Sequence, residues 1–196
     1  GVYEDGRVQC WGLNLYWQLG NRSEDSRSPT PIKARDISDA IEITLGSNHS
    51  CARLVDKTVA CWGSNGRGQM GDERRERRTR AKMVRDLKNV VNIGAGRNHT
   101  CAVMQSGTVR CWGDNRYGQL GDGSRNLRTR PRRVLGLNDA ILVQGGDRHS
   151  CAIKADRTVA CWGSNESRAL GIKYRRGRTK PVQVPLIADA QELKIQ

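Results

Sequence analysis

Three pairs of cysteines are the first residues of this chain whose types and spacing could do chemistry. The two members of each pair are ten residues apart, and a histidine precedes the first member by two positions. The pairs are Cys51 with Cys61, Cys101 with Cys111, and Cys151 with Cys161, and the histidines are His49, His99 and His149. Thiols placed in this way can form a disulfide, stay reduced in a reducing compartment, or bind zinc together with the histidine.

Three basic segments are the second candidate, because guanidinium groups bind phosphate and carboxylate oxygens. The net charge is +14, from 34 basic and 20 acidic residues. Each segment carries five Lys or Arg, only Glu76 opposes them, and basic and acidic residues are equal in number elsewhere. The basic residues are Arg74, Arg75, Arg77, Arg78 and Arg80; Arg125, Arg128, Arg130, Arg132 and Arg133; and Lys173, Arg175, Arg176, Arg178 and Lys180.

These residues belong to a unit of about 50 residues that occurs four times, which is typical of repeat architectures. We divide the chain into repeats 1–45, 46–95, 96–145 and 146–196, all within one domain. The second cysteine of each repeat is followed by Trp-Gly, at Trp11, Trp62, Trp112 and Trp162. Since these large apolar residues and the three histidines recur at fixed positions, we expect both sets to be structural and the tryptophans to pack between repeats.

The cysteines lie on a predicted β-hairpin. Residues 99–104 (HTCAVM) and 108–113 (TVRCWG) are short runs around a three-residue loop that ends in Gly107. In this register Cys101 faces Cys111, and facing residues of a narrow antiparallel pair have Cα atoms about 4.5 Å apart, within disulfide reach. The hairpin therefore favours disulfides. Reduced thiols remain an alternative, and zinc is a weaker one because no fourth ligand recurs.

Four short strands per repeat predict an all-β fold. Residues 90–96 add a strand before the hairpin, and we expect a last strand near the proline, at 132–135 and 181–184. No useful helical periodicity is present, so the sequence predicts a β-propeller of about four blades, each of four antiparallel strands. The basic segments would then lie in equivalent connections before the last strand and form one patch on successive blades. The alternative is a solvated face with a compositional bias toward arginine.

The repeat G-x-x-H-[ST]-C-A…V-x-C-W-G-x-N-x-x-G-Q-L-G, residues 96–121 and again 46–71 with Met70 for Leu, resembles that of the regulator-of-chromosome-condensation family. The first copy departs at 15–17 and the fourth at 166–169. The resemblance implies a seven-bladed propeller, and two cysteines per repeat are similar to its bacterial and cell-surface branch. We therefore expect a fragment of a longer propeller whose remaining blades are partners, with a permuted set of four blades as the alternative.

No P-loop, G-x-S-x-G, H-E-x-x-H or dinucleotide motif occurs, so we expect neither catalysis nor a cofactor or metal. No run is apolar enough to span a membrane. The expected function is recognition of a protein or a polyanion, meaning nucleic acid, anionic polysaccharide or an acidic protein surface. The resemblance implies two alternatives, guanine-nucleotide exchange on a small GTPase and inhibition by a secreted protein. Disulfides would favour an extracytoplasmic location (secreted, periplasmic or cell surface), and reduced cysteines a cytoplasmic one.

Overall fold

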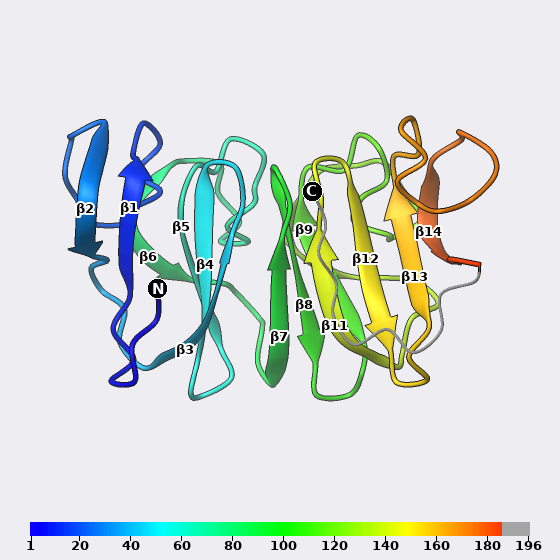
Figure 1. The fold of residues 1–196 in the computed structure, drawn as a ribbon, viewed down its shortest axis with the longest axis horizontal. Coiled ribbons are helices and arrows are strands. Elements are labelled where there is room, and N and C mark those ends of the chain that lie inside the picture. Colours follow the sequence, from blue (N-terminus) through cyan, green and yellow to red (C-terminus); the bar gives the residue numbers. More distant parts are fainter. Residues whose placement is uncertain (186–196) are drawn as a thin grey trace.

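Antiparallel β-strands form all four sheets of residues 1–185, the part of the chain that this computed structural model describes (Figure 1). The first sheet holds β1 (Gln9–Leu13) and β2 (Arg27–Lys33). The others have four strands each: β3 (Ala40–Leu45), β4 (His49–Leu54), β5 (Val59–Gly63) and β6 (Arg78–Met83); β7 (Val90–Ala95), β8 (His99–Met104), β9 (Val109–Gly113) and β10 (Arg128–Arg133); β11 (Ala140–Gly145), β12 (His149–Lys154), β13 (Val159–Gly163) and β14 (Arg178–Gln183). The all-β prediction is confirmed.

The sheets stand side by side as blades, and in the view of Figure 1 all their strands run roughly vertically, alternately up and down. Strand β7 contacts both β3 and β11, so the first strand of each four-stranded blade lies next to the common axis. The sheet order then places the last strands, β6, β10 and β14, at the opposite, outer edge. The long connections after β1, β5, β9 and β13 emerge together at the upper end of the molecule in Figure 1.

The sequence repeats are offset from the sheets. Repeat 46–95 supplies β4, β5 and β6 of one blade and then β7 of the next. Adjacent blades are therefore linked covalently through the innermost strand of the following blade. Each chain segment of repeat length thereby contributes to two sheets, which couples the folding of neighbouring blades.

The outermost strands begin earlier than the sequence predicts. We expected strands at 132–135 and 181–184, whereas β10 begins at Arg128 and β14 at Arg178. In β10 the register shifts between Arg128, opposite Gly113, and Arg132, opposite Cys111. This β-bulge contains Pro131, and a bulge tolerates proline because no ladder hydrogen bond is needed there. The basic segments consequently lie partly in strands and not wholly in connections, which corrects the sequence prediction.

The core is a series of layers between adjacent blades. Trp162 of the fourth blade packs with Cys101 and Cys111 of the third, and Trp112 packs with Cys51 and Cys61 in the same way. The glycine that closes each repeat permits this contact, since a Cβ on Gly121 would lie 2.9 Å from Trp162 Nε1 and its φ is +67°. Burying an aromatic side chain of this size contributes several kcal/mol.

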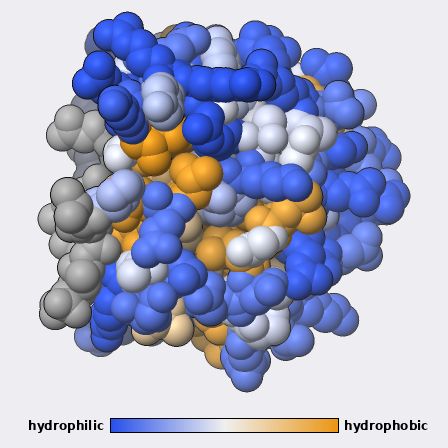
Figure 2. Space-filling model, turned by 90° about the vertical axis from the view of Figure 1, so that its right-hand side faces the viewer, coloured by the Kyte–Doolittle hydropathy of each residue, from blue (hydrophilic) through white to orange (hydrophobic). Residues whose placement is uncertain are grey.

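The outer face of the fourth blade carries its own apolar cluster. Ile153, Val159, Leu170 and Val184 are buried there, with Ile172 partly buried against them. Figure 2 shows hydrophobic residues gathered in the middle of this side of the molecule, with hydrophilic residues around them. In the described part of the chain, no helix long and apolar enough to cross a bilayer is present.

Candidate functional site

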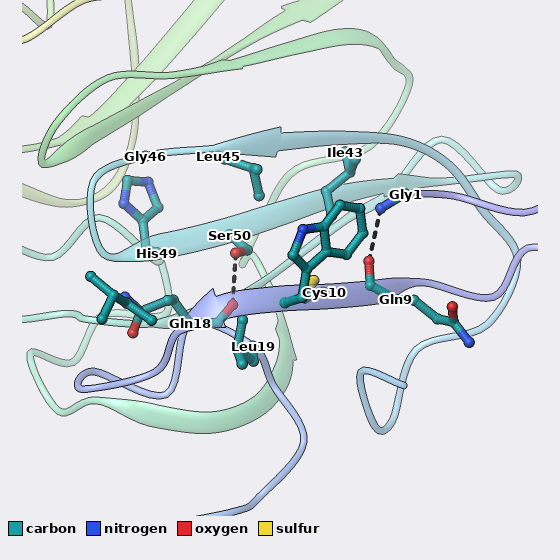
Figure 3. A pocket seen from close by; sticks show the side chains of 12 residues that line it. Gly1, Gln9, Cys10, Gln18, Leu19, Ile43, Leu45, Gly46, His49 and Ser50 are labelled. Atoms are coloured by element: carbon teal, nitrogen blue, oxygen red, sulfur yellow. Dashed lines mark hydrogen bonds between the residues drawn. The ribbon is translucent and has the colours of Figure 1, made fainter. Parts of the chain in front are cut away.

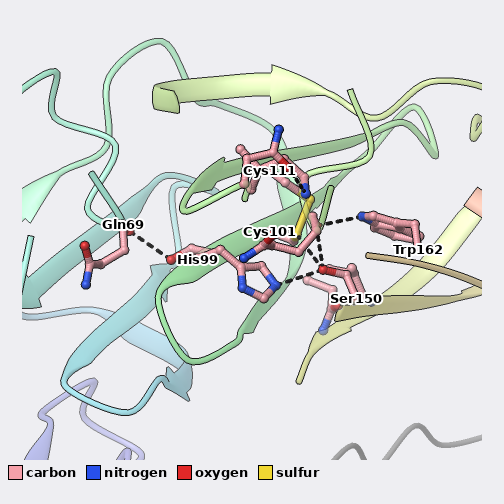
Figure 4. Close-up of a disulfide and its surroundings, with 12 residues drawn as sticks. Gln69, His99, Cys101, Cys111, Ser150 and Trp162 are labelled. Carbon is pink, nitrogen blue, oxygen red and sulfur yellow. Dashed lines mark hydrogen bonds between the residues drawn. A yellow bond between two sulfur atoms is a disulfide. The ribbon is translucent and has the colours of Figure 1, made fainter. Parts of the chain in front are cut away.

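The three cysteine pairs are cross-strand disulfides in the middle of the blades. Cys101 of β8 lies directly opposite Cys111 of β9, and the Cα atoms of each bridged pair are 4.1 Å apart (Figure 4). All six cysteines are buried. The predicted register and pairing are confirmed, and the zinc and free-thiol interpretations of these pairs are wrong because both sulfurs are consumed.

Two of the three histidines, His49 and His99, close a hydrogen-bond relay to the next blade. His99 Nε2 lies 2.8 Å from Ser150 Oγ, which donates to the carbonyl oxygen of Gln119 at 2.8 Å, and Trp162 Nε1 donates to the same carbonyl at 2.8 Å (Figure 4). His49, Thr100, Gln69 and Trp112 repeat the arrangement one blade earlier. Because the hydroxyl proton is used on the carbonyl, Nε2 of the histidine must carry the proton. These side chains hold blades together, and His49 also lines an apolar hollow beside β1.

Burial keeps the histidines neutral. Loss of solvation lowers the pKa of His49 to about 3 and that of His99 to about 4, with a smaller contribution from the neighbouring histidine in each case. The Nδ1 atoms of both rings are buried without a hydrogen-bond partner within residues 1–185. Each ring packs against a glycine, since a Cβ on Gly96 would lie 2.1 Å from His99 Cε1. Asp114 and Asp147 favour the charged form of His99, but the loss of solvation outweighs them.

Trp11 departs from the other repeat tryptophans. Trp62, Trp112 and Trp162 are fully buried, whereas Trp11 is 57% exposed, because no other sheet of the described residues covers its side of β1. It borders an apolar hollow beside β1 that also contains Cys10 and Leu45 (Figure 3). Cys10 is buried and unbridged in the described chain, and burial raises the pKa of its thiol. Within residues 1–185 three of the four repeat tryptophans are packed between blades, and Trp11 is not.

The arginines of the basic segments are of two kinds. Some form ion pairs with acidic residues of their own blade or of the preceding one. Counting basic residues in the sequence therefore overestimates how many arginines are free to bind a ligand. These pairs are Arg78 with Asp72, Arg128 with Asp122, Arg80 with Asp36, Arg130 with Glu73, and Arg74 with Glu76. The remaining segment residues make no ion pair within residues 1–185: Arg75, Arg77, Arg125, Arg132, Arg133, Lys173, Arg175, Arg176, Arg178 and Lys180.

The outermost strands concentrate positive charge. Strands β2, β6, β10 and β14 carry two, three, four and two Lys or Arg respectively, and none of the four contains Asp or Glu. We call these strands together the basic rim. Three of its residues, Arg27, Lys33 and Lys82, lie outside the segments that the sequence singled out. These three basic residues are visible in the sequence, but they could be assigned to the rim only once the last strand of each blade was located.

Similar sheets around one axis, three of which contain the same disulfide and two of which are joined to the next by the same histidine relay, define a β-propeller repeat protein. The model of the regulator of chromosome condensation (RCC1) repeat matches residues 5–53, 58–103 and 106–153, and a second RCC1-repeat model matches 40–69, 90–119 and 141–168. The chain belongs to the RCC1 repeat family.

Similar proteins place the fold within longer chains. Protein pim1 of Schizosaccharomyces pombe is 39% identical over 72 residues, which are 34% of this chain and 13% of pim1. Yeast RCC1 (Prp20), solved bound to Kap60, superposes with a TM-score of 0.82 at 24% identity over 91% of this chain and 44% of Prp20. Human WBSCR16 gives a TM-score of 0.78 at 23% identity over 90% of this chain and 48% of that protein. The chain thus spans less than half the length of each.

Proposed function

We propose that this propeller is a non-catalytic recognition module whose basic rim binds an acidic partner, either a polyanion or an acidic protein surface. The RCC1-repeat fold supports a protein-binding or regulatory role. The observation that carries the finer proposal is the basic rim, with positive charge on all four outermost strands and no acidic residue among them. A surface of one sign attracts oppositely charged partners and speeds their encounter.

The exposed rim residues suit contacts with oxyanions. Lys82, Arg132 and Arg133 are exposed, and none of them forms an ion pair within residues 1–185. Arginine binds carboxylate and phosphate through paired N–H groups, so these side chains could serve either kind of partner. Few aromatic side chains accompany them. A nucleic acid would therefore be held through its phosphates without reading of its sequence.

A protein partner also agrees with what is known of a similar structure. Prp20p of Saccharomyces cerevisiae, with a TM-score of 0.82 at 23% identity over 93% of this chain and 47% of its own, was described with its binding properties to Gsp1p and histones. Those partners are stated for Prp20p. For this chain the likeness supports protein recognition as a role of the fold, while the basic rim supports the acidic character of the partner.

Heparin affinity tests the proposal. The triple variant Lys82→Glu, Arg132→Glu and Arg133→Glu should elute at clearly lower salt than the native protein, because it reverses three unpaired charges of the rim. The matched control reverses three exposed charges outside the outermost strands, Lys57→Glu and Arg157→Glu in hairpin turns and Lys88→Glu in the connection between β6 and β7. The control should elute close to the native protein. Equal shifts in both triples would show that only net charge matters and would reject the rim.

We further propose an extracytoplasmic location, secreted, periplasmic or at the cell surface. Three buried disulfides support it, because such bridges persist in oxidising compartments and are rare in the cytosol. A thiol titration of the denatured native protein should detect Cys10 and no bridged cysteine. Detection of all seven cysteines in protein isolated under acid quench would instead indicate a reducing compartment.

A further inference from the structure

The fourth blade differs from the second and third at one position of the connection that precedes the outermost strand. Asp72 and Asp122 occupy this position in the second and third blades, and Ile172 occupies it in the fourth. The arginine that begins the strand is retained in all three, as Arg78, Arg128 and Arg178. The fourth blade therefore keeps the cation and lacks its carboxylate.

The aspartate neutralises the arginine in the other two blades. Arg78 donates from Nε and Nη2 to Asp72 Oδ2 at 3.0 and 2.8 Å, and Arg128 donates from Nε to Asp122 Oδ2 at 2.8 Å. The Asp72 and Asp122 side chains are 9% and 7% exposed, and both also accept from the loop amide of Asn65 or Asn115. The positive charge at the start of β6 and β10 is thus used inside the blade.

Arg178 has no such partner. Its Nη1 donates to the carbonyl oxygens of Arg176 at 2.9 Å and Gly177 at 3.4 Å, and no ion pair to it exists within residues 1–185. The side chain is half-buried, so its charge is partly removed from water without a counter-charge. A partly desolvated guanidinium with open N–H groups is suited to an external oxyanion.

Arg178 lines an open hollow between the third and fourth blades. The hollow has a volume of about 940 Å³ and is lined by Arg125, Tyr174, Arg176, Gly177, Arg178 and Thr179. Arg125 comes from the connection before β10, and the others from the connection before β14 and its first residues, at the upper right of Figure 1. Asn165 Nδ2 donates to the carbonyl oxygen of Tyr174 and holds this connection in place. Three guanidinium groups and no acidic side chain line the hollow.

We propose that this hollow binds a tetrahedral oxyanion, a sulfate or phosphate group, with Arg178 as its innermost ligand and Arg125 and Arg176 at its mouth. Paired N–H groups of arginine match the oxygen spacing of such groups. Tyr174 adds an exposed ring beside the cations, which can cover the organic part of a sulfate or phosphate ester. The biological role of the site rests on the function proposed above, but binding of the inorganic ions does not.

The sharpest test puts back the missing carboxylate. Sodium sulfate and sodium phosphate are titrated into ¹⁵N-labelled native protein at constant ionic strength, and the side-chain Nε–H signal of Arg178 is followed. The native protein should show saturable shifts. The variant Ile172→Asp should bind about tenfold more weakly or not at all, because an internal carboxylate then occupies Arg178 as in the other blades. Native-like affinity of this variant would overturn the site.

Two further variants protect this test from trivial outcomes. Ile172 is partly buried against the apolar cluster, so Ile172→Asp could weaken binding simply by destabilising the blade. The double variant Arg125→Gln and Arg176→Gln leaves that cluster intact and removes two guanidinium groups from the mouth of the hollow. It should also bind the ions about tenfold more weakly. Gln183→Glu adds one negative charge at the far, exposed end of β14 and should keep native affinity. Equal weakening in Gln183→Glu would reduce the effect to net charge and reject the site.

The relative affinities for sulfate and phosphate then indicate the source of the ligand group. A preference for sulfate favours a sulfate ester as the bound group, and a preference for phosphate favours a phosphate ester. The outcome is separable from that of the heparin experiment. If only the hollow is wrong, Ile172→Asp binds the ions normally while the rim triple still loses heparin. If only the rim function is wrong, the ions bind the native protein saturably while heparin elution of the rim triple is unchanged.

Discussion

The interior between blades and the basic rim outside them are built from the same repeat, yet only the interior repeats its contacts. Cys101, Trp162 and His99 have counterparts one blade earlier with the same partners. On the rim, Arg128 is paired with an aspartate and Arg178 is not, although both begin the same strand. Close packing allows one arrangement in the interior, whereas solvent lets each rim residue take whatever partner lies nearby.

The largest expected effect compares two tryptophans at one repeat position. Trp112→Ala should destabilise the fold by about 3–5 kcal/mol, because it empties a buried site and breaks a hydrogen bond to Gln69. Trp11→Ala should cost less than about 1 kcal/mol, since its ring is mostly exposed. Urea unfolding of both variants measures the difference. Similar losses would mean that Trp11 is covered in solution and that the first blade packs as the others do.

The next effect concerns the buried histidines and pH. The folded-state pKa values of His49 and His99, about 3 and about 4, lie below the ordinary value of 6.5, so the unfolded chain takes up protons that the folded protein does not. Their neutral forms therefore stabilise the fold fully above pH 6.5, and this stability is lost as pH falls toward 4. At pH 5 the loss should be roughly 2 kcal/mol for each histidine.

Measurement of unfolding free energy against pH checks this expectation. The variant His99→Gln should lower stability at pH 7 but should show a pH dependence smaller by about one proton between pH 6.5 and 4. Subtracting the pH dependence of the variant from that of the native protein removes the contribution of carboxylates that titrate in the same pH range, because both proteins contain them. An unchanged slope would show that the His99 ring is accessible to protons in the folded protein.

The smallest expected effect sharpens the contrast on the rim itself. Arg128→Ala should cost about 1–2 kcal/mol, because it leaves Asp122, whose side chain is 7% exposed, without its cation. Arg178→Ala should change stability by no more than about 0.5 kcal/mol, since only carbonyl contacts are lost. Thermal unfolding at matched salt compares the two. An equal cost would mean that Arg178 also has a structural partner, which would leave less of its charge for an oxyanion.

Local features were predictable because they depend on spacing within one repeat. The facing pair Cys101 and Cys111 follows from a three-residue hairpin loop and the two-residue period of a strand. The start of β10 was not predictable, because a bulge around Pro131 shifts the register by an amount that local residue types do not specify. The ion pairs were equally hidden, since Arg80 meets Asp36 and Arg130 meets Glu73 across blades, far apart in the chain.

The amino-acid sequence by itself determined the four-strand repeat, the disulfide register and the excess of positive charge, because these follow from periodicity, turn length and composition. Only the tertiary structure decided which arginines remain available, that the outermost strands carry them, and that Trp11 is exposed. Ion pairing and burial depend on which side chains of other blades come within a few ångströms, and that distance is a property of the assembled blades.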